Sequence, residues 1–397
     1  MLKKACLLVL FVSIVFSCNN DDDIIPVCDI VTNISSNSIT NNSAIITWET
    51  ISTSATYTIE YGISGFTLGS GTTVSESDTD AELNNLESNT TYDVYIQTVC
   101  DTNNLSMQTD VYSFTTLLLD VATEFKPILS EMNLFIGNLE DLLITPLAFE
   151  YNLSTSLFSD YAHKQRIIAL PSGTSMEFDG DGLPLFPDNT VIAKTFYYNI
   201  DERNVSLGRQ IVETRILIKI NGSWETGDYK WIDASGTSNS ITYKIPSNTD
   251  CFTCHHNNDD IRPIGPKLRS MNFEIDGVNQ LEQFISNQQL SGVASSTSVR
   301  SLPNWEDTSL PLDVRARAYM DINCAHCHIP GGQCEEESTL NFAFETPLEE
   351  SNIANQTFLI DYRINADVDG VRMPFIGTTI LHTEGVQLIQ DYIDTLD

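Results

Sequence analysis

Two short stretches of the chain hold the residues best suited to chemistry. Residues 251–255 read CFTCH and residues 324–328 read CAHCH, so each is Cys-x-x-Cys followed directly by His. The whole chain has nine cysteines and six histidines in 397 residues, and four of the cysteines and three of the histidines lie here. This clustering indicates two sites that bind a metal or a cofactor.

Three chemistries could use this pattern: a zinc site, a redox disulfide and covalent haem. Cysteines three positions apart lie on one side of a helical turn, where both can form thioethers with one haem while the next residue offers its imidazole to the iron. Zinc tolerates many spacings, and a redox disulfide needs no histidine at that position. The repeated spacing therefore predicts two haem c groups, with His326 as a variable position inside the second motif. The predicted cofactor-binding residues are Cys251, Cys254 and His255 for one haem, and Cys324, Cys327 and His328 for the other.

Each iron also has a second axial position. Met373, in VRMPFIG, is the only methionine after His328, and Met-Pro is the usual setting of the ligand in small cytochromes c, so we expect it to bind the second iron. No Met-Pro follows His255 before the second motif, and Met271 is the preferred candidate there. A five-coordinate iron also remains open, as do ligands supplied by His163, His256 and His382.

Two predicted helices frame the second motif. Residues 312–323 lead into it, and residues 383–396 place Val386, Ile389 and Ile393 at helical spacing. Pairing of a first and a last helix is the plan of small cytochromes c. We therefore expect an α-helical cytochrome c-like domain over residues 312–397, preceded by a first haem-binding segment over 251–311.

A β-rich domain is predicted over residues 118–250. Residues 190–199 and 211–220 are strong strand candidates, whereas residues 129–139 have a helix-like apolar spacing that Gly137 breaks. Several cations stand out in an acidic chain, and they either form ion pairs on the strand faces or hold haem propionates. These cations are Lys194, Arg203, Arg209 and Arg215.

An all-β sandwich is predicted over residues 27–117, because short strands with alternating apolar residues are separated by Gly, Ser and Asn-rich turns. Trp48 and the stretch LESNTTY, ending at Tyr92, make it resemble a fibronectin type III domain, which implies a spacer or a binding module. Cys28 and Cys100 flank the domain and are predicted to form a disulfide. Cys334 has no predicted role.

The N-terminus predicts export. Residues 1–17 combine Lys3 and Lys4 with a short apolar run, as in a secretory signal peptide. The end of this run, VFSC, resembles a bacterial lipobox, which implies lipidation of Cys18, and residues 18–26 read as an acidic tether. We therefore expect a lipoprotein anchored in the outer membrane or at the cell surface of a Gram-negative bacterium.

Length and charge narrow the function further. A chain of 397 residues exceeds the usual size of one domain, so a multidomain protein is expected. Its 20 Lys and Arg against 54 Asp and Glu give a net charge of −34, which repels phosphate backbones. Nucleic acid is therefore excluded as a partner.

Most of the chain after residue 128 resembles a family of secreted bacterial dihaem c-type cytochromes whose task is largely unassigned. This resemblance implies a β-rich domain fused to a haem module, with haem on both motifs. It leaves the sixth ligand of the first haem and the role of Cys334 open. The matching segments are LFSDYAHKQR, KTFYYN, GRQIVETRILI, YKIPSNTDCFTCH, RPIGPKLR, RARAYMDINCAHCH and LHTEGVQLI.

The predicted function is one-electron transfer by a surface-anchored dihaem cytochrome, with an unidentified redox protein as partner and the membrane reached through the lipid anchor. Two alternatives stay open. One is a peroxidase-like dihaem enzyme with an open first iron, and the other is an adhesion or binding lipoprotein with an accessory haem domain. No catalytic residue is assigned.

Overall fold

The computed structural model describes residues 28–51, 55–232, 248–258, 260–368 and 370–396. The predicted signal peptide, the lipidation site at Cys18 and the whole predicted tether over residues 18–26 lie outside these residues. The chain divides into two compact units, Met1–Leu119 and Asp120–Asp397. Within the described residues, no helix has both the length and the apolar character needed to cross a bilayer.

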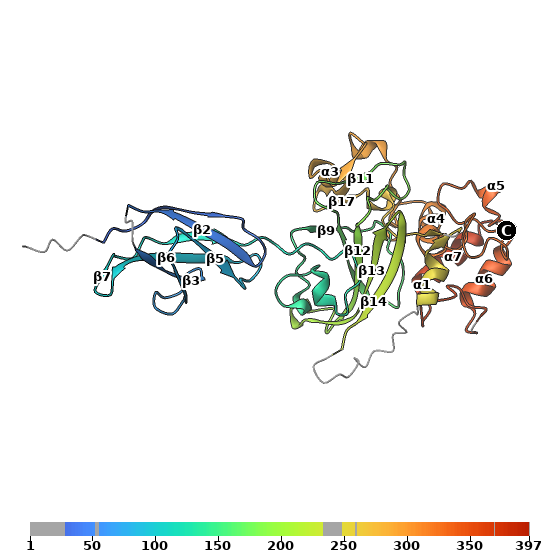
Figure 1. Cartoon of the computed structure of the whole chain (residues 1–397). Helices are drawn as coiled ribbons and strands as arrows, with labels where there is room; N and C mark the ends of the chain where they lie inside the picture. Colours follow the sequence, from blue (N-terminus) through green and yellow to red (C-terminus); the bar gives the residue numbers. More distant parts are fainter. Residues whose placement is uncertain (1–27, 52–54, 233–247, 259, 369, 397) are drawn as a thin grey trace, which may run out of the picture. The chain divides into compact units, whose positions relative to one another are not determined.

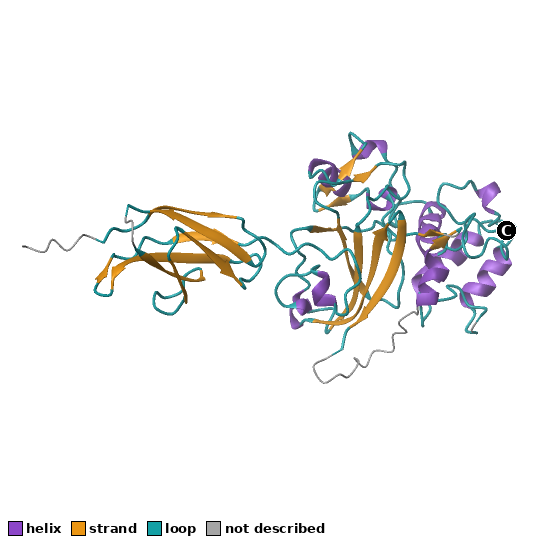
Figure 2. Cartoon of the chain, viewed as in Figure 1, coloured by secondary structure: helices purple, strands orange, loops and turns teal. Residues whose placement is uncertain are grey.

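The first unit consists of two antiparallel sheets (Figure 2). The three-stranded sheet contains β1 (Thr32–Asn37), β2 (Ser43–Glu49) and β5 (Asp80–Asn84), in the order β1-β2-β5. The five-stranded sheet contains β4 (Thr72–Glu76), β3 (Thr56–Ile63), β6 (Thr91–Asp101) and β7 (Asn104–Leu105) in that order, and β8 (Tyr112–Thr115) also pairs with β6.

Alternating side chains from both sheets form the core of this unit, as period-2 patterning requires. The Trp48 and Tyr57 rings meet edge to face with centroids 5.1 Å apart. The Tyr92 hydroxyl accepts a hydrogen bond of 2.8 Å from the amide of Glu87, which is the tyrosine corner of such sandwiches. The predicted β-sandwich is therefore confirmed. Its fully buried residues include Ala44, Ile46, Ile59, Leu83, Val94 and Ile96.

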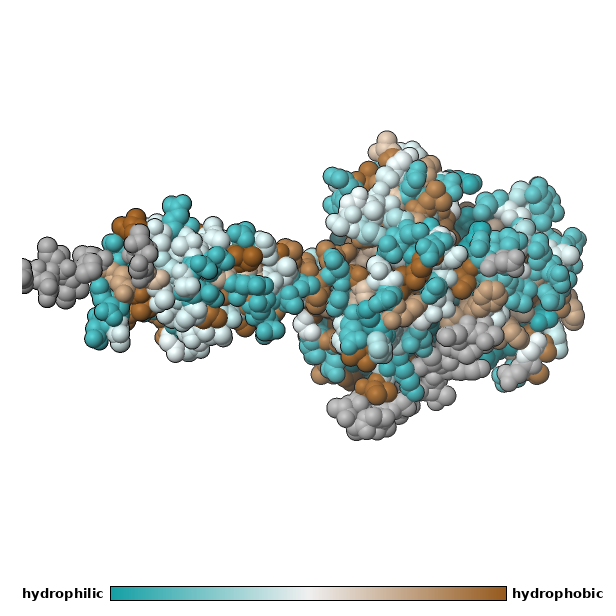
Figure 3. Space-filling view, viewed as in Figure 1, coloured by the Kyte–Doolittle hydropathy of each residue, from teal (hydrophilic) through white to brown (hydrophobic). Residues whose placement is uncertain are grey.

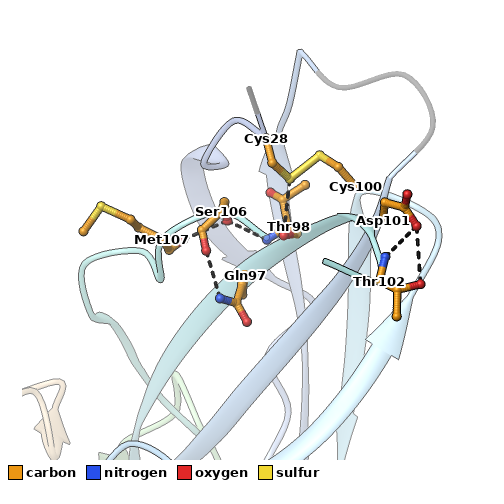
Figure 4. The surroundings of a disulfide bond; sticks show 8 residues. All are labelled: Cys28, Gln97, Thr98, Cys100, Asp101, Thr102, Ser106 and Met107. Carbon is orange, nitrogen blue, oxygen red and sulfur yellow. Dashed lines mark hydrogen bonds between the residues drawn. A yellow bond between two sulfur atoms is a disulfide. The ribbon is translucent and has the colours of Figure 1, made fainter. Parts of the chain in front are cut away.

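A disulfide joins Cys28 to Cys100, with their Cα atoms 5.8 Å apart (Figure 4). The bond ties the chain before β1 to the end of β6. Beside it, the amide of Thr98 donates to the Ser106 hydroxyl at 2.8 Å, and the amide of Ser106 donates back to the Thr98 carbonyl at 2.9 Å. These contacts hold β6 against the chain that follows it.

The second unit is built on a five-stranded antiparallel sheet (Figure 1). Its order is β14-β13-β12-β10-β9. Neighbouring strands of the sheet also follow one another in the chain, except β10 and β12, between which one short strand intervenes. The strands are β9 (Ala148–Glu150), β10 (His163–Ala169), β12 (Val191–Asn199), β13 (Arg209–Ile220) and β14 (Ser223–Lys230). The strands predicted at 190–199 and 211–220 are confirmed.

The two faces of this sheet carry different residues. One face buries Ile167, Val191 and Ile216 against an apolar cluster that includes Met132 and Leu134. The opposite face buries the alternate residues, among them Ile168, Ile192 and Leu217. The same opposite face also carries the cations at 166, 194 and 215, because residues two apart on a strand share a face.

The helix-like spacing over residues 129–139 does not correspond to an α-helix in the structure. The structure has two short 3-10 turns there, η1 (Leu129–Met132) and η2 (Leu139–Asp141). Asn133 ends the first turn with φ of 54°, a left-handed conformation that stops a helix, and Gly137 follows with φ of 69°. The apolar residues at helical spacing pack on the sheet without forming a helix.

Small elements fill the space beside the sheet. They are β11 (Met176–Glu177) with β19 (Leu290–Ser291), β17 (Glu274–Ile275) with β18 (Val278–Asn279), the helices α2 (Leu268–Met271) and α3 (Gln280–Ser286), and the 3-10 turns η3 (Val205–Leu207) and η4 (Ser296–Ser298). The β-rich character of this part of the chain is thus clear, and seven α-helices occur among the described residues.

The remaining helices gather at one side of the sheet (Figure 1). They are α1 (Asn248–His255), α4 (Leu312–Asn323), α5 (Leu348–Ser351), α6 (Thr357–Asn365) and α7 (Thr383–Ile393). Helix α4 covers the predicted residues, and α7 begins where predicted, so both predictions are confirmed. Ala316, Tyr319 and Met320 of α4 share an apolar cluster with Leu388 and Ile389 of α7. Hydrophilic side chains are prominent on the outside of this helical end in the view drawn (Figure 3).

Candidate functional site

The first motif ends helix α1. His255 is the last residue of α1, and the chain then forms a short hairpin of β15 (His256–Asn257) and β16 (Asp260–Ile261). This hairpin brings the Arg262 carbonyl to 2.8 Å from His255 Nδ1. A carbonyl only accepts, so Nδ1 donates the proton, and the Nε2 lone pair is left for a metal. The backbone after the motif therefore sets the histidine tautomer that a metal ligand needs.

Electrostatics keep this imidazole neutral. Burial, together with the nearby Lys194 ammonium, lowers the pKa of His255 to about 3. A neutral imidazole is the form that binds metals. His255 is therefore suited to metal ligation at neutral pH in both its tautomer and its charge.

The second motif begins where α4 ends. Cys324 is the C-cap of this helix, and its carbonyl accepts from the amides of Cys327 at 3.2 Å and His328 at 3.0 Å. These bonds form one helical turn, which places Cys324 and His328 on the same side of the chain. The Phe342 ring lies edge-on to the His328 ring, with centroids 5.2 Å apart.

An apolar cavity of about 540 Å³ lies beside the second motif, with Cys324, Cys327 and His328 in its lining. Its size is within the range of about 300–1,000 Å³ typical of ligand and cofactor sites. Helices α4, α6 and α7 supply much of the wall. Its apolar side chains include Met320, Leu340, Ile360, Ile364, Leu381 and Ile389.

Met373 lines the same cavity as His328. The loop that carries it is held at several points. The Met373 amide donates to the Arg363 carbonyl at 2.9 Å, and the Arg372 guanidinium donates to the carbonyls of Thr378 and Thr379. The Asp160 carboxylate accepts from the Thr379 amide at 2.8 Å, which ties the loop to the chain before β10. The structure thus brings this predicted ligand to the cavity of the second motif.

The two motifs lie close together in the structure, although 68 residues separate them in the sequence. The ligand atoms of Cys254, His326 and Cys327 all lie within 4.8 Å of one another. Backbone contacts support this approach, since the amide of Asn258 donates to the Gly331 carbonyl at 2.7 Å. Interactions with Cys327 and His326 lower the pKa of Cys254. Three donor atoms at this separation could also hold a single zinc ion, with tetrahedral coordination completed by a fourth ligand.

Cys334 lies next to Cys327 of this cluster. Its amide donates to the Cys327 carbonyl at 3.1 Å, and it lines the large cavity. Interactions with Cys327 and His328 lower its pKa. A turn of the backbone brings Cys334 beside the second motif. The spacing of the cysteines in the sequence did not predict this turn.

The space beside the first motif is smaller. A cavity of about 80 Å³ is lined by Cys251, Cys254 and His255 together with Lys194 and Arg215 of the sheet. The donor set of the motif fits a haem c, but the enclosed volume is that of a small molecule rather than a macrocycle. The large cavity gives the second motif the better fit of the two.

The structure does not bring Met271 to His255. Met271 is fully buried in the core with Leu281 and Phe284, and it does not line the cavity beside His255. Its surroundings are the ordinary ones of a core methionine. The preference for this residue as sixth ligand is therefore corrected.

The other histidines considered for the first iron lie elsewhere. His163 stacks on Tyr197, and His256 stacks on Phe252. The His382 ring stacks on Phe158 with centroids 4.2 Å apart, and it lines the large cavity. None of the three lines the small cavity.

His326 is the residue that sequence reasoning missed. It lines both cavities, and its Nδ1 atom is buried with no hydrogen-bond partner among the described residues. The pattern Cys-x-x-Cys-His treats its position as variable, so the motif itself gives no signal. An imidazole in a chain with only six histidines was the one available hint.

Comparison with known proteins identifies the first unit. The model of the fibronectin type III domain matches residues 29–113. Residues 29–113 therefore form a fibronectin type III domain, as the sequence resemblance predicted. No curated protein matches the chain.

Three solved structures illustrate the similarity. A computationally redesigned β-sandwich protein is 30% identical, with a TM-score of 0.20, and the match covers 23% of this chain and 96% of that one. A myokine structure is 18% identical, with a TM-score of 0.20, and the match covers 22% and 95%. The chicken CNTN1 FN1-FN3 domains are 16% identical, with a TM-score of 0.21, and the match covers 22% and 30%.

Proposed function

We propose that the second unit carries two covalent haem c groups and that the protein transfers single electrons. The observation that carries this proposal is the cavity of about 540 Å³ with Cys324, Cys327 and His328 in its lining. When bound, haem iron supplies a reversible one-electron change of charge. The cysteines would hold the group, His328 would bind its iron, and the apolar wall would exclude water.

Zinc explains fewer of these residues. A zinc ion held by Cys254, His326 and Cys327 would use one cysteine from each motif. It would leave Cys251, His255, Cys324 and His328 without a role, together with the large cavity. The donor sets of both motifs suit haem c, the larger cavity favours the second motif, and the Arg262 carbonyl supports His255 in the tautomer that a metal ligand needs.

The finer architecture follows from this assignment. Helices α4, α6 and α7 would form a cytochrome c-like module around the second haem, with Met373 as the sixth ligand. For the first haem we propose His326 as the sixth ligand, because it lines the small cavity together with His255. The fibronectin type III domain would act as a spacer.

The convergence of the motifs favours electron transfer over catalysis. Groups attached at Cys254 and Cys327 would lie close together, since their sulfur atoms lie within 4.8 Å of each other. Peroxide reduction needs an open iron and a positioned acid or base. With Met373 and His326 as ligands, neither iron would be open.

Redox titration separates these two functions. We expect the purified protein to take up two electrons per chain in one-electron steps and to show negligible peroxide-dependent oxidation of a reduced donor. Both irons should be low-spin by electron paramagnetic resonance. A high-spin first iron combined with substantial peroxide turnover would instead indicate the peroxidase-like enzyme.

We propose that the protein is exported and anchored at a membrane surface. Lipidation of Cys18 would place the chain in the membrane fraction, where a redox protein would meet it. We expect Cys18→Ser to release the protein into the soluble fraction or to mislocalise it, while the haem content stays unchanged. Cys6→Ser, inside the apolar run of the signal, is the matched control and should fractionate as wild type. Soluble wild-type protein would contradict the anchor.

A further inference from the structure

Three cations form one cross-strand row on the sheet of the second unit. Arg166 of β10 lies opposite Lys194 of β12, and Lys194 lies opposite Arg215 of β13. Side chains directly opposite on antiparallel strands share a face with Cβ atoms about 4.5–5.5 Å apart, so like charges there repel. Lys164, two residues before Arg166 on β10, adds a fourth cation to this face.

Three of these cations lie over the aromatic ring of Phe196. The Nζ atoms of Lys164 and Lys194 each lie 5.8 Å from the ring centroid, and the Arg215 guanidinium carbon lies 4.6 Å from it. Cation–π attraction orients these groups but does not neutralise their charge. The row therefore keeps its cations close together without removing their repulsion.

Acidic residues compensate only one end of the row. Glu213 is fully buried and accepts from the Arg215 guanidinium, and Asp228 lies opposite Arg215 on β14. Burial and the neighbouring Glu213 raise the pKa of Asp228 to about 7. Both acids belong to the side of the row formed by β13 and β14.

The other end has only longer-range acidic neighbours, because the charge of Asp160 acts on Lys164 and that of Glu213 acts on Lys194 without a direct ion pair. Among the described residues, no salt bridge joins Lys164, Arg166 or Lys194 to a carboxylate. Lys164 donates to the Ala162 carbonyl at 3.0 Å. Arg166 is buried, one of its nitrogens lies 3.5 Å from the Ser156 hydroxyl, and its Nε has no partner among the described residues. Buried cations in this arrangement carry a cost unless an anion offsets it.

Lys194 lines the cavity of about 80 Å³ that also contains Cys251 and His255. One water takes up about 30 Å³ of liquid, so this space suits a group the size of a carboxylate or a small oxyanion. We infer that Lys194, the residue of this end of the row that lines the cavity, binds an anionic group of carboxylate size there.

This anion has two possible sources. A carboxylate of the first haem would place the row in cofactor binding, and this source rests on the proposed function. A free small anion, with acetate as the probe, would make the cavity a ligand site beside His255. The chemistry that the cations recognise is the same in both cases.

Lys194→Met tests the inference through the sign of its effect on stability. If an anion is bound, the variant loses a charge-assisted contact, and the thermal midpoint of the second unit should fall by about 3–10 °C. If no anion is bound, the variant removes a cation that its neighbours repel, and the midpoint should rise. Lys230→Met, which removes an exposed cation of the same sheet, is the control and should leave the midpoint nearly unchanged.

An acetate series distinguishes the two sources. The midpoint difference between wild type and Lys194→Met, measured at equal acetate concentrations, should grow with acetate if the anion is free. It should stay constant if the anion is a carboxylate of bound haem. Comparing the two proteins at each concentration removes effects of ionic strength that they share.

Equal or higher midpoints for Lys194→Met across the whole series would overturn the inference. Haem content measured on the same samples separates this failure from failure of the proposed function. Two haems per chain with a raised midpoint would leave the cytochrome intact and remove the anion site. Fewer than two haems per chain, with a midpoint loss in Lys194→Met that grows with acetate, would contradict the proposed function and keep the anion site.

Discussion

Replacing Met373 by leucine is expected to abolish the methionine-to-iron absorption band and to lower the potential of the second haem. Leucine keeps the volume of the side chain but offers no thioether sulfur, so the effect on packing is small while the ligand is lost. The choice of axial ligand accounts for a range of about 0.8 V in haem potentials, so we expect a shift on the order of tenths of a volt. Visible spectroscopy and spectroelectrochemistry measure both effects.

Met320 provides the matched control. It also lines the large cavity, but it lies on α4 and is fully buried in the packing between α4 and α7. Met320→Leu should keep the band and most of the potential. If the band survives in Met373→Leu and disappears in Met320→Leu, the iron is bound by the helix residue, and the role given to the loop is wrong.

Replacing Cys324 and Cys327 together by serine is expected to remove one of two covalent haems. Serine cannot form the thioethers, so haem that survives acid–acetone extraction should fall to about half of the wild-type amount. The paired replacement of Cys251 and Cys254 should remove the other half. Each variant should keep the spectrum of the haem that remains.

Cys334→Ser is the control for this experiment. Cys334 lies beside Cys327 and His328 but stands outside both motifs, so its replacement should leave the haem content unchanged. Loss of haem in this variant would mean that Cys334 takes part in attachment. Retention of both haems after the Cys324 and Cys327 replacement would show that these residues do not hold one.

Local patterns were sufficient to predict much of this fold. Alternation around Trp48 and Tyr92 predicted the β-sandwich, and helical spacing predicted α4 and α7, because each pattern depends on neighbours in the sequence. The same spacing failed at residues 129–139, where left-handed Asn133 interrupts the chain and the apolar residues pack as short turns. Here the pattern of apolar side chains predicted which residues are buried but did not predict the backbone conformation.

The arrangement of the candidate site depends on long-range contacts that no local pattern contains. The approach of Cys254 to Cys327 comes from the packing of the first hairpin on the loop near Gly331. The row that contains Lys194 depends on strand register, and a shift of one residue would have turned that side chain to the other face. Met271 was misjudged for the same reason, because its sequence distance from His255 says nothing about the core that surrounds it.

Haem and zinc content per mole of purified wild-type protein tests the central claim most directly. A pyridine haemochrome assay after acid–acetone extraction counts covalent haem, and elemental analysis of the same sample counts iron and zinc. The proposed function predicts two haems and two irons per chain with no stoichiometric zinc. One zinc per chain without covalent haem would contradict it and would assign Cys254, His326 and Cys327 to a zinc site instead.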